Sequence, residues 1–303
     1  MIELKKITKK FGDFTAVKDV SFTVEDGSLY GLIGYNGAGK TTLLKTITGV
    51  YKAEGGEVLL DGEKAFDNEK MKQHMFYVPD DIYFAPYASM EKMAKFYNGF
   101  YPDFSYDTFH ELADVFALDT KARLNGFSKG MQRQAEIVLG FATRPSFMLF
   151  DETFDGLDPA KRALIKNMIQ EYMQETKAYI IVSSHDLHEL EGMCDHFGLI
   201  NGKKLVLNTS LQELQSNRVK FRLAFDYTMT EEELKQKGFI VKGFKEDGKT
   251  ILVTFLGTEE ELTKQIAENL HPIFMETMPL SLEEVFLDEM EGTEYDFSKI
   301  FSK

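Results

Sequence analysis

One segment constrains the fold of this chain more than any other feature, and it consists of Gly34, Tyr35, Asn36, Gly37, Ala38, Gly39, Lys40, Thr41 and Thr42. An apolar run, LYGLI (29–33), precedes it, and a predicted helix follows, in which Leu43, Leu44 and Ile47 lie on one face. Because glycine lacks a Cβ atom, successive backbone N–H groups can converge on an anion there, and the positive end of the helix strengthens the field. The segment therefore predicts an anion-binding loop between a strand and a helix.

The same segment has the pattern of a P-loop, in which the polar residues have defined roles toward a nucleotide. Lys40 is expected to reach the β- and γ-phosphates, and Thr41 to offer its hydroxyl to Mg²⁺. A glycine-rich turn that arises by chance is the alternative, but such a turn rarely lies directly before a helix. We therefore expect the chain to bind a nucleotide together with Mg²⁺.

A second apolar run, FMLFDE (147–152), ends in two acidic residues. If it is a strand of the same sheet, its last residues lie at the edge where the phosphate loop presents its ligand. Asp151 suits the coordination shell of Mg²⁺, and Glu152 suits a general base that orients and deprotonates an attacking water. The alternative is that the acids mark only the solvent-exposed end of a strand.

The size, charge and cysteine content of the chain limit its class. With 303 residues it is long enough for about two domains. It has 35 basic and 49 acidic residues, a formal net charge of −14, which argues against a surface built to bind nucleic acid. Cys194 is the one cysteine, so no intramolecular disulfide forms and a reducing cytosol fits best. No apolar stretch approaches the length of a membrane-spanning helix, and we expect the chain neither to cross a membrane nor to be secreted.

The order of predicted elements indicates an α/β core with a helical insertion. Short β-rich runs surround the first helix up to about residue 62, and helical periodicity follows in residues 90–101, 106–118 and 130–142. The runs at 147–152 and 178–186 are continuous and apolar, as in parallel strands covered on both faces, with a helix expected near 159–175. Past about residue 205, shorter runs predict a small α+β appendage.

Five motifs together resemble the nucleotide-binding subunit of an ABC transporter: GYNGAGKTT (34–42), FSKGM (127–131), FMLFDE (147–152), DGLD (155–158) and His185 in VSSHD. The resemblance extends from about Ile2 to about Gly202. It implies a P-loop NTPase core sheet of the ABC type, with a helical lobe at about 80–145, an ATP-binding domain at 1–205 and a small C-terminal α+β accessory domain at 206–303. It also implies that ATP, with Mg²⁺, lies between two such subunits.

The resemblance further implies roles for residues outside the P-loop. Ser128, Lys129, Gly130 and Met131 would act on the ATP held by the partner subunit, and Asp158 would cross the dimer interface. His185 would hydrogen-bond the γ-phosphate, Phe11 would stack on adenine, and Val17 would line the ribose side. Four of these residues have a plainer alternative: Ser128 and Asp158 suit helix N-caps, His185 suits a purely structural histidine, and Phe11 suits a buried core position.

The chain departs from the commonest family pattern at several positions. Asp80 stands where many relatives carry a glutamine that touches Mg²⁺; an aspartate is shorter and charged, and it could still bind the metal. Lys129 and Met131 replace the usual glycine and glutamine, and Thr153 replaces a usual proline. The segment SLEEVFLDEM (281–290) resembles the C-terminal helix of some export or immunity subunits, with Leu282, Val285, Phe286 and Met290 on its apolar face.

These observations predict an ATP-hydrolysing subunit that powers a separate integral-membrane permease, exporter-like, docked on the helical lobe near the aromatic segment 82–87. It would act as a homodimer or a heterodimer, without nucleic acid, in the cytoplasm at the inner face of the membrane. Alternatives are an ABC ATPase of translation, a DNA-repair ATPase, and a nucleotide-sensing regulator. The single cassette and acidic charge disfavour the first, the short distance between the motifs disfavours the second, and Glu152 disfavours the third.

Overall fold

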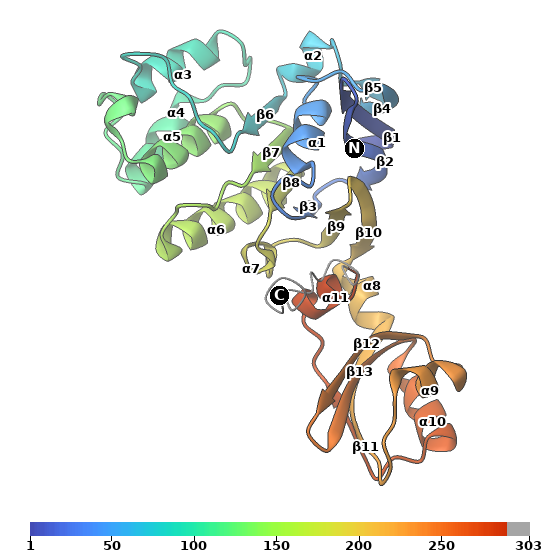
Figure 1. The fold of residues 1–303 in the computed structure, drawn as a ribbon. Coiled ribbons are helices and arrows are strands. Elements are labelled where there is room, and N and C mark those ends of the chain that lie inside the picture. Colours follow the sequence, from blue (N-terminus) through green and yellow to red (C-terminus); the bar gives the residue numbers. More distant parts are fainter. Residues whose placement is uncertain (290–303) are drawn as a thin grey trace, which may run out of the picture. The chain divides into compact units, whose positions relative to one another are not determined.

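A computed structural model describes residues 1–289, and the chain divides into two compact units, with the boundary between Asn208 and Thr209 (Figure 1). The first unit contains two sheets and most of the helices. The second contains one sheet and four short helices. Each unit has its own hydrophobic core.

One sheet of the first unit is antiparallel, with strand order β2-β1-β4-β5. Its strands are β1 (Ile2–Phe11), β2 (Phe14–Val24), β4 (Gly55–Leu60) and β5 (Glu63–Lys64). Along β1 and β2 the buried residues recur with interruptions, because the register shifts in three places between Leu4 and Lys10. This sheet covers one side of the core, and Phe11 is the last residue of β1, where it pairs with Phe14 at the β1–β2 hairpin.

The other sheet of the first unit has six strands in the order β10-β9-β3-β8-β7-β6. The strands are β3 (Leu29–Ile33), β6 (Met75–Val78), β7 (Phe147–Asp151), β8 (Tyr179–Ser184), β9 (His196–Asn201) and β10 (Lys204–Ser210). The five from β9 to β6 run parallel, with Ile33 beside Ser184 and Asp151 beside Ser183. Because parallel strands end at one edge, the residues that follow β3, β7 and β8 meet there.

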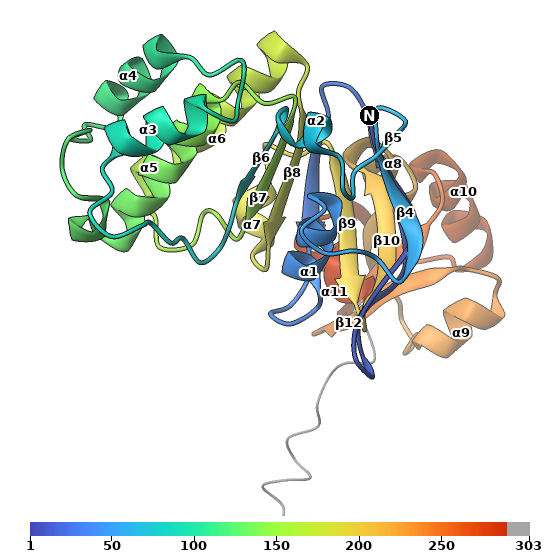
Figure 2. The same cartoon turned by 90° about the horizontal axis from the view of Figure 1, so that it is seen from above.

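Helix α1 (Lys40–Ile47) lies between the two sheets (Figure 2). Its apolar residues Leu43, Leu44 and Ile47 have no exposed surface, and they pack with residues of both sheets in one core cluster. The helix ends as predicted: Thr48 is its C-cap and Gly49 takes a positive φ of 70°. The core thus fixes the helix whose first residue is Lys40.

The predicted helical lobe is present and packs beside β6 (Figure 1). Its elements are α3 (Met90–Asn98), α4 (Tyr106–Val115), the 3₁₀ turn η1 (Leu124–Gly126) and α5 (Lys129–Ala142). Ser89, Ser105 and Ser128 cap the three α-helices by accepting a hydrogen bond from a backbone N–H in the first turn. A short helix, α2 (Glu69–Lys72), precedes β6.

Two helices connect the strands that carry the remaining motifs. Helix α6 (Pro159–Thr176) begins after its N-cap Asp158 with proline in its first turn, and it ends at Lys177 in the left-handed conformation. Tyr172 of α6 meets Phe141 of α5 edge to face, with ring centroids 5.0 Å apart. Helix α7 (Leu187–Leu190) follows β8 and packs against it.

The second unit is an α+β domain, as predicted. Its sheet is antiparallel with strand order β12-β13-β11-β14. Its elements are α8 (Leu211–Ser216), β11 (Arg218–Ala224), α9 (Glu231–Gln236), β12 (Val241–Asp247), β13 (Thr250–Leu256), α10 (Glu259–Asn269), β14 (Phe274–Met278) and α11 (Leu282–Glu289). The predicted C-terminal helix is α11, where Val285 and Phe286 are buried; Met290 lies outside the described residues.

Within residues 1–289, none of the helices combines the length and the apolar character that a membrane span requires.

Candidate nucleotide-binding site

The loop between β3 and α1 has the backbone that a phosphate cradle needs. Gly37 and Gly39 adopt positive φ values of 82° and 113°. A Cβ atom on Gly39 would lie 2.6 Å from Cγ1 of Val17, and one on Gly34 would lie 2.7 Å from the carbonyl oxygen of Ile200. The close approach of surrounding atoms therefore requires glycine at 34 and 39. Val17, which was expected at the ribose side, is completely buried, and its side chain packs against the loop at Gly39.

The Lys40 side chain is buried and folds back over this loop. Its ammonium donates to the carbonyl oxygens of Gly34 and Tyr35, the latter at 3.2 Å. It also forms an ion pair with Glu152, with Nζ 2.8 Å from Oε1. The loop, α1 and the end of β7 thus converge on one cation.

Glu152 links this lysine to His185. Its Oε2 atom accepts the backbone N–H of His185 at 3.2 Å and lies 2.8 Å from Nδ1 of the ring. Burial opposes ionisation of Glu152, but the hydrogen bonds from Lys40 and His185 outweigh it and lower the pKa of the carboxyl. The hydrogen bond to Glu152 in turn raises the pKa of His185. Glu152 takes a left-handed φ of 47°, the kind of strained backbone found at functional sites.

Asp151 has no exposed surface, and neutral hydroxyls hold its carboxylate. Ser183 donates to Oδ1 and Tyr77 donates to Oδ2, both at 2.8 Å. Burial and the charge of Asp151 raise the pKa of Tyr77, so the phenol stays a donor. Within residues 1–289, no Lys or Arg side chain forms an ion pair with Asp151. A carboxylate with its charge uncompensated, together with the hydroxyl of Thr41, is a fitting oxygen-donor set for Mg²⁺.

Asp80, directly after β6 and Pro79, faces a cation from the helical lobe. Arg133 of α5 lies with Nη2 3.4 Å from Oδ1 of Asp80 and donates to the Asp80 carbonyl oxygen at 2.8 Å. Burial raises the pKa of Asp80, although Arg133 works against this shift. The predicted metal ligand at this position is therefore already engaged in an ion pair.

Comparison with known proteins identifies the family of this chain. The sequence profile described as "ABC transporter" matches residues 17–155. The ABC transporter ATP-binding protein YtrB of Bacillus subtilis (strain 168) is 30% identical over 96% of this chain and 99% of its own length. The chain belongs to the ATP-binding proteins of ABC transporters.

Three further matches support this assignment. The bacitracin transport ATP-binding protein BcrA of Bacillus licheniformis is 27% identical over 96% of this chain and 98% of its own length. A solved structure, "Structure of ATP binding subunit of ABC transporter", matches with a TM-score of 0.66 and 26% identity over 71% of this chain and 92% of that chain. The dimeric cassette MJ0796, at 21% identity, has the same fold, with a TM-score of 0.64 over 70% of this chain and 99% of that chain. The chain is thus an ATP-binding, ATP-hydrolysing subunit of an ABC transporter.

Ser128 of the ABC signature and Asp158 are helix N-caps in this chain, as their plainer alternatives predicted. Ser128 accepts the N–H of Met131 at 3.2 Å, and Asp158 accepts that of Lys161 at 3.0 Å. Both side chains are exposed, and a cap of this kind leaves the other N–H groups of the helix terminus free to face an anion. Across the described part of the chain, neither Ser128 nor Asp158 makes a hydrogen bond to the P-loop.

Phe11 does not fill the core, which was the alternative to adenine stacking. It is 45% exposed, and its ring meets Tyr51 edge to face at 5.3 Å. The Nζ atom of Lys9 lies 5.0 Å from the ring centroid. An open aromatic face is what stacking on a base requires.

Sequence reasoning missed several residues of the site. Tyr77, Ser183 and Arg133 hold the predicted metal ligands, but each contact joins segments far apart in the chain. Only Ser183 carried a signal, because it lies in VSSHD beside the predicted switch histidine. Glu189 was also missed: it is buried in α7 and accepts a hydrogen bond from the hydroxyl of Ser184 at 2.6 Å, which fixes the last residue of β8, directly before His185.

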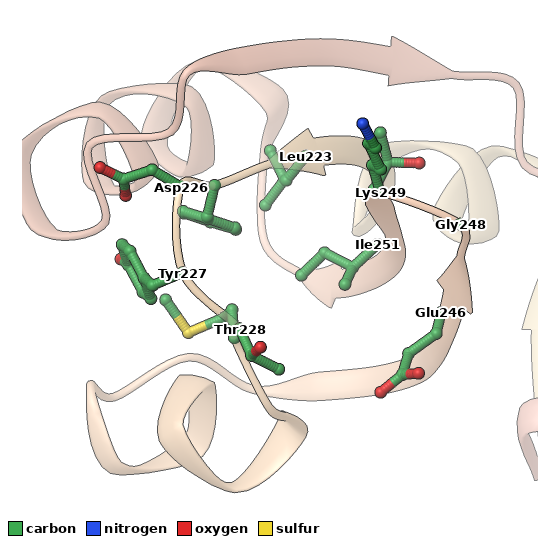
Figure 3. Close-up of a pocket in the computed structure, with 11 residues that line it drawn as sticks. Leu223, Asp226, Tyr227, Thr228, Glu246, Gly248, Lys249 and Ile251 are labelled. Carbon is green, nitrogen blue, oxygen red and sulfur yellow. The ribbon is translucent and has the colours of Figure 1, made fainter.

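The second unit has a cavity of its own, about 390 Å³ in volume, between the segment after β11 and the β12–β13 turn (Figure 3). Leu223 and Ile251 form its buried floor, while Asp226, Glu246 and Lys249 are exposed at its rim. This open depression contains none of the residues that the ABC motifs predict.

Proposed function

We propose that Glu152 is the general base of ATP hydrolysis in this chain, with Lys40 and His185 as its neighbours on the γ-phosphate. The observation that carries this is the contact of one carboxylate with both residues, at 2.8 Å each. A low pKa keeps the carboxylate ionised and ready to accept a proton. Glu152 takes a proton from water, the water oxygen attacks the γ-phosphorus, and the bond to the β-bridging oxygen breaks to give ADP and phosphate.

The remaining cradle residues bind and orient the nucleotide. N–H groups of the segment 34–42 and the Lys40 ammonium hold the phosphates, and the open ring of Phe11 stacks on adenine. Asp151 and Thr41 hold Mg²⁺, with Asp80 as a further ligand; the ion, when bound, offsets the charge of the phosphate oxygens. His185 donates to a γ-phosphate oxygen.

Two copies of this cassette, or this chain and a related one, close around ATP head to tail. The N–H groups at the N-terminus of α5 complete the partner's site; they belong to the exposed Ser128 and Lys129 and the partly buried Gly130 and Met131. Asp158, at the start of α6, couples the two sites. Opening after hydrolysis returns the dimer to its starting state.

The energy goes to a separate membrane permease, and the transporter is an exporter. Support comes from the relatives: BcrA is named for bacitracin transport and matches across both units, and LnrL of Bacillus subtilis (strain 168), 29% identical over 69% of each chain, is named for linearmycin resistance.

The permease contacts the segment 82–87, where Tyr83 is 83% and Tyr87 66% exposed while only Phe84 is buried. The subunit therefore works in the cytoplasm, peripheral to the membrane.

Substitution Glu152→Gln tests the role of the base. It retains the shape of the site but removes proton acceptance, so phosphate release is expected to fall by about 10²- to 10⁴-fold while ATP binding persists. Glu191→Gln is the matched control, because Glu191 is partly exposed and pairs with His188 outside the site. Steady-state hydrolysis that is unchanged in Glu152→Gln would remove this residue from its role.

A further inference from the structure

Arg133 lies in the second turn of α5, and its guanidinium reaches from the helical lobe to the ends of two core strands. Nη1 donates to the carbonyl oxygen of Pro79 at 3.1 Å and to that of Asp151 at 3.5 Å. Nη2 donates to the carbonyl oxygen of Asp80 at 2.8 Å. The register of β6 with β7 ends just before these residues, so the guanidinium joins the two strands beyond their last paired positions.

The same guanidinium is an ion-pair partner for Asp80, with Nη2 3.4 Å from Oδ1. The Arg133 side chain is only 10% exposed, whereas that of Asp80 is 51% exposed. One side of the carboxylate is thus held by a buried, fixed cation, and the other side is open. A glutamine, the usual residue of the family at position 80, carries no charge and would not be attracted in this way.

A carboxylate oxygen is also a preferred ligand of divalent cations. Asp151, the other acidic residue of the expected metal site, presents its carbonyl oxygen to Arg133 but its carboxylate to neutral hydroxyls. Of the two acidic residues expected to bind the metal, Asp80 is therefore the one whose carboxylate forms an ion pair with a protein cation, Arg133. A metal that draws Asp80 toward the phosphates must first compete with that cation.

We propose, on the basis of the proposed function, that Arg133 is a positioning residue that competes with the nucleotide-bound divalent cation for the Asp80 carboxylate. The affinity of the site for the metal is then lower than Asp80 alone would give. Arg133 belongs to α5, the helix that Ser128 caps. When the Asp80 carboxylate leaves Arg133, α5 therefore loses one ion pair with the metal-binding edge of the sheet.

The experiment measures metal binding directly and uses Mn²⁺ as the probe. Mn²⁺ is titrated into full-length protein that is saturated with the non-hydrolysable analogue AMP-PNP, and free Mn²⁺ is counted by electron paramagnetic resonance. The proteins are the wild type, Arg133→Gln, Asp80→Gln and the double variant. Arg144→Gln is the matched control, because Arg144 is exposed just after the other end of α5. Circular dichroism confirms that each variant is folded.

The competition has a distinct signature in this set. Since a half-exposed pair contributes little, Arg133→Gln is expected to tighten Mn²⁺ binding about two- to fivefold. Asp80→Gln weakens it, and in the Asp80→Gln background the Arg133 substitution changes nothing. Arg144→Gln leaves binding as in the wild type.

Three outcomes would overturn the proposal. The first is a folded Arg133→Gln protein that binds Mn²⁺ no more tightly than the wild type. The second is equal tightening of Mn²⁺ binding by the Arg133 substitution in the wild-type and Asp80→Gln backgrounds, which would indicate a general effect of charge. The third is an Asp80→Gln protein whose Mn²⁺ affinity is unchanged. Should Arg133→Gln fail to fold, Asp80→Gln still tests whether Asp80 reaches the metal. A wild-type protein that binds no Mn²⁺ with the analogue would instead refute the proposed metal site, and this proposal with it.

Discussion

The Nζ atom of Lys40 lies 2.8 Å from Oε1 of Glu152, so the cation expected to hold phosphate is paired with the carboxylate expected to activate water. Both side chains are largely buried, and each is the other's counter-charge. A triphosphate that binds Lys40 therefore competes with Glu152. Whether Glu152 is paired with Lys40 therefore depends on whether the P-loop holds a nucleotide.

Replacement of this lysine is expected to weaken nucleotide binding. Lys40→Ala removes charge-assisted hydrogen bonds to the phosphates, and the dissociation constant for ATP should rise about tenfold to a hundredfold. Lys45→Ala on the same helix is the control and should bind like the wild type. Equilibrium binding of a fluorescent ATP analogue measures both. An unchanged constant in Lys40→Ala would refute the cradle assignment.

The cradle glycines are expected to differ in their tolerance of alanine. At Gly39 a Cβ atom would lie 2.7 Å from the carbonyl oxygen of Ala16 and closer still to Val17, whereas at Gly37 it would enter open space. Both positions add the cost of a positive φ, about 1–2 kcal/mol. Gly39→Ala should therefore lose more ATP affinity and more thermal stability than Gly37→Ala. Calorimetric titration and thermal unfolding of the two variants compare them; equal effects would contradict the packing argument.

Elements with strong periodicity were predictable from the sequence, and short or mixed ones were not. Helices α1, α3 to α6 and strands β7 and β8 lie where apolar spacing placed them. Strand β6 was missed, because four residues give little periodicity and helical segments follow it. In the second unit, α9 and α10 begin with runs of glutamate that resemble a solvated loop, although Leu234 and Ile266 anchor them in the core.

The local chemistry of the site was predictable, but its long-range supports were not. The P-loop is one continuous segment, and its strand–loop–helix context was readable from neighbouring residues. Arg133 reads as an ordinary polar residue on a helix; its burial follows from where β6 ends, which no local pattern reveals. Tyr77 likewise gains its role only when β6 pairs with β7.

Thr153 follows the base and carries a buried hydroxyl that has no hydrogen-bond partner within the described residues. Valine has nearly the same shape without the polar group, so Thr153→Val is expected to raise the free energy of unfolding by about 1 kcal/mol. Thr143→Val is the matched control: Thr143 is equally buried, but its hydroxyl donates to Gly140 at 2.8 Å, and its loss should cost about 1 kcal/mol. Denaturant unfolding measures both. A destabilised Thr153→Val would mean that the hydroxyl has a partner after all.

Glu136 of α5 is a buried acid that should make the stability of the protein depend on pH. The Tyr97 hydroxyl donates to its carboxyl at 3.2 Å. Burial raises the pKa of Glu136 from an ordinary 4.5 to about 7, with the Tyr97 hydrogen bond working against the shift. The folded protein thus keeps a proton that the unfolded chain has already lost, and the free energy of unfolding falls as pH rises between these two values.

Glu136→Gln keeps an acceptor for Tyr97 but removes the titration. The wild type should therefore be more stable relative to this variant at pH 4.5 than at pH 8, by about 3 kcal/mol if the whole shift is expressed. Most of that difference should disappear between pH 4.5 and pH 7, and little of it should remain above pH 7, where the carboxyl is ionised in the folded state as well. Urea unfolding of both proteins at pH values from 4.5 to 8, followed by circular dichroism, measures it. Because every other titrating group is common to the two proteins, a difference that stays constant with pH would show that Glu136 is already ionised in the folded protein, with more hydration than its burial implies.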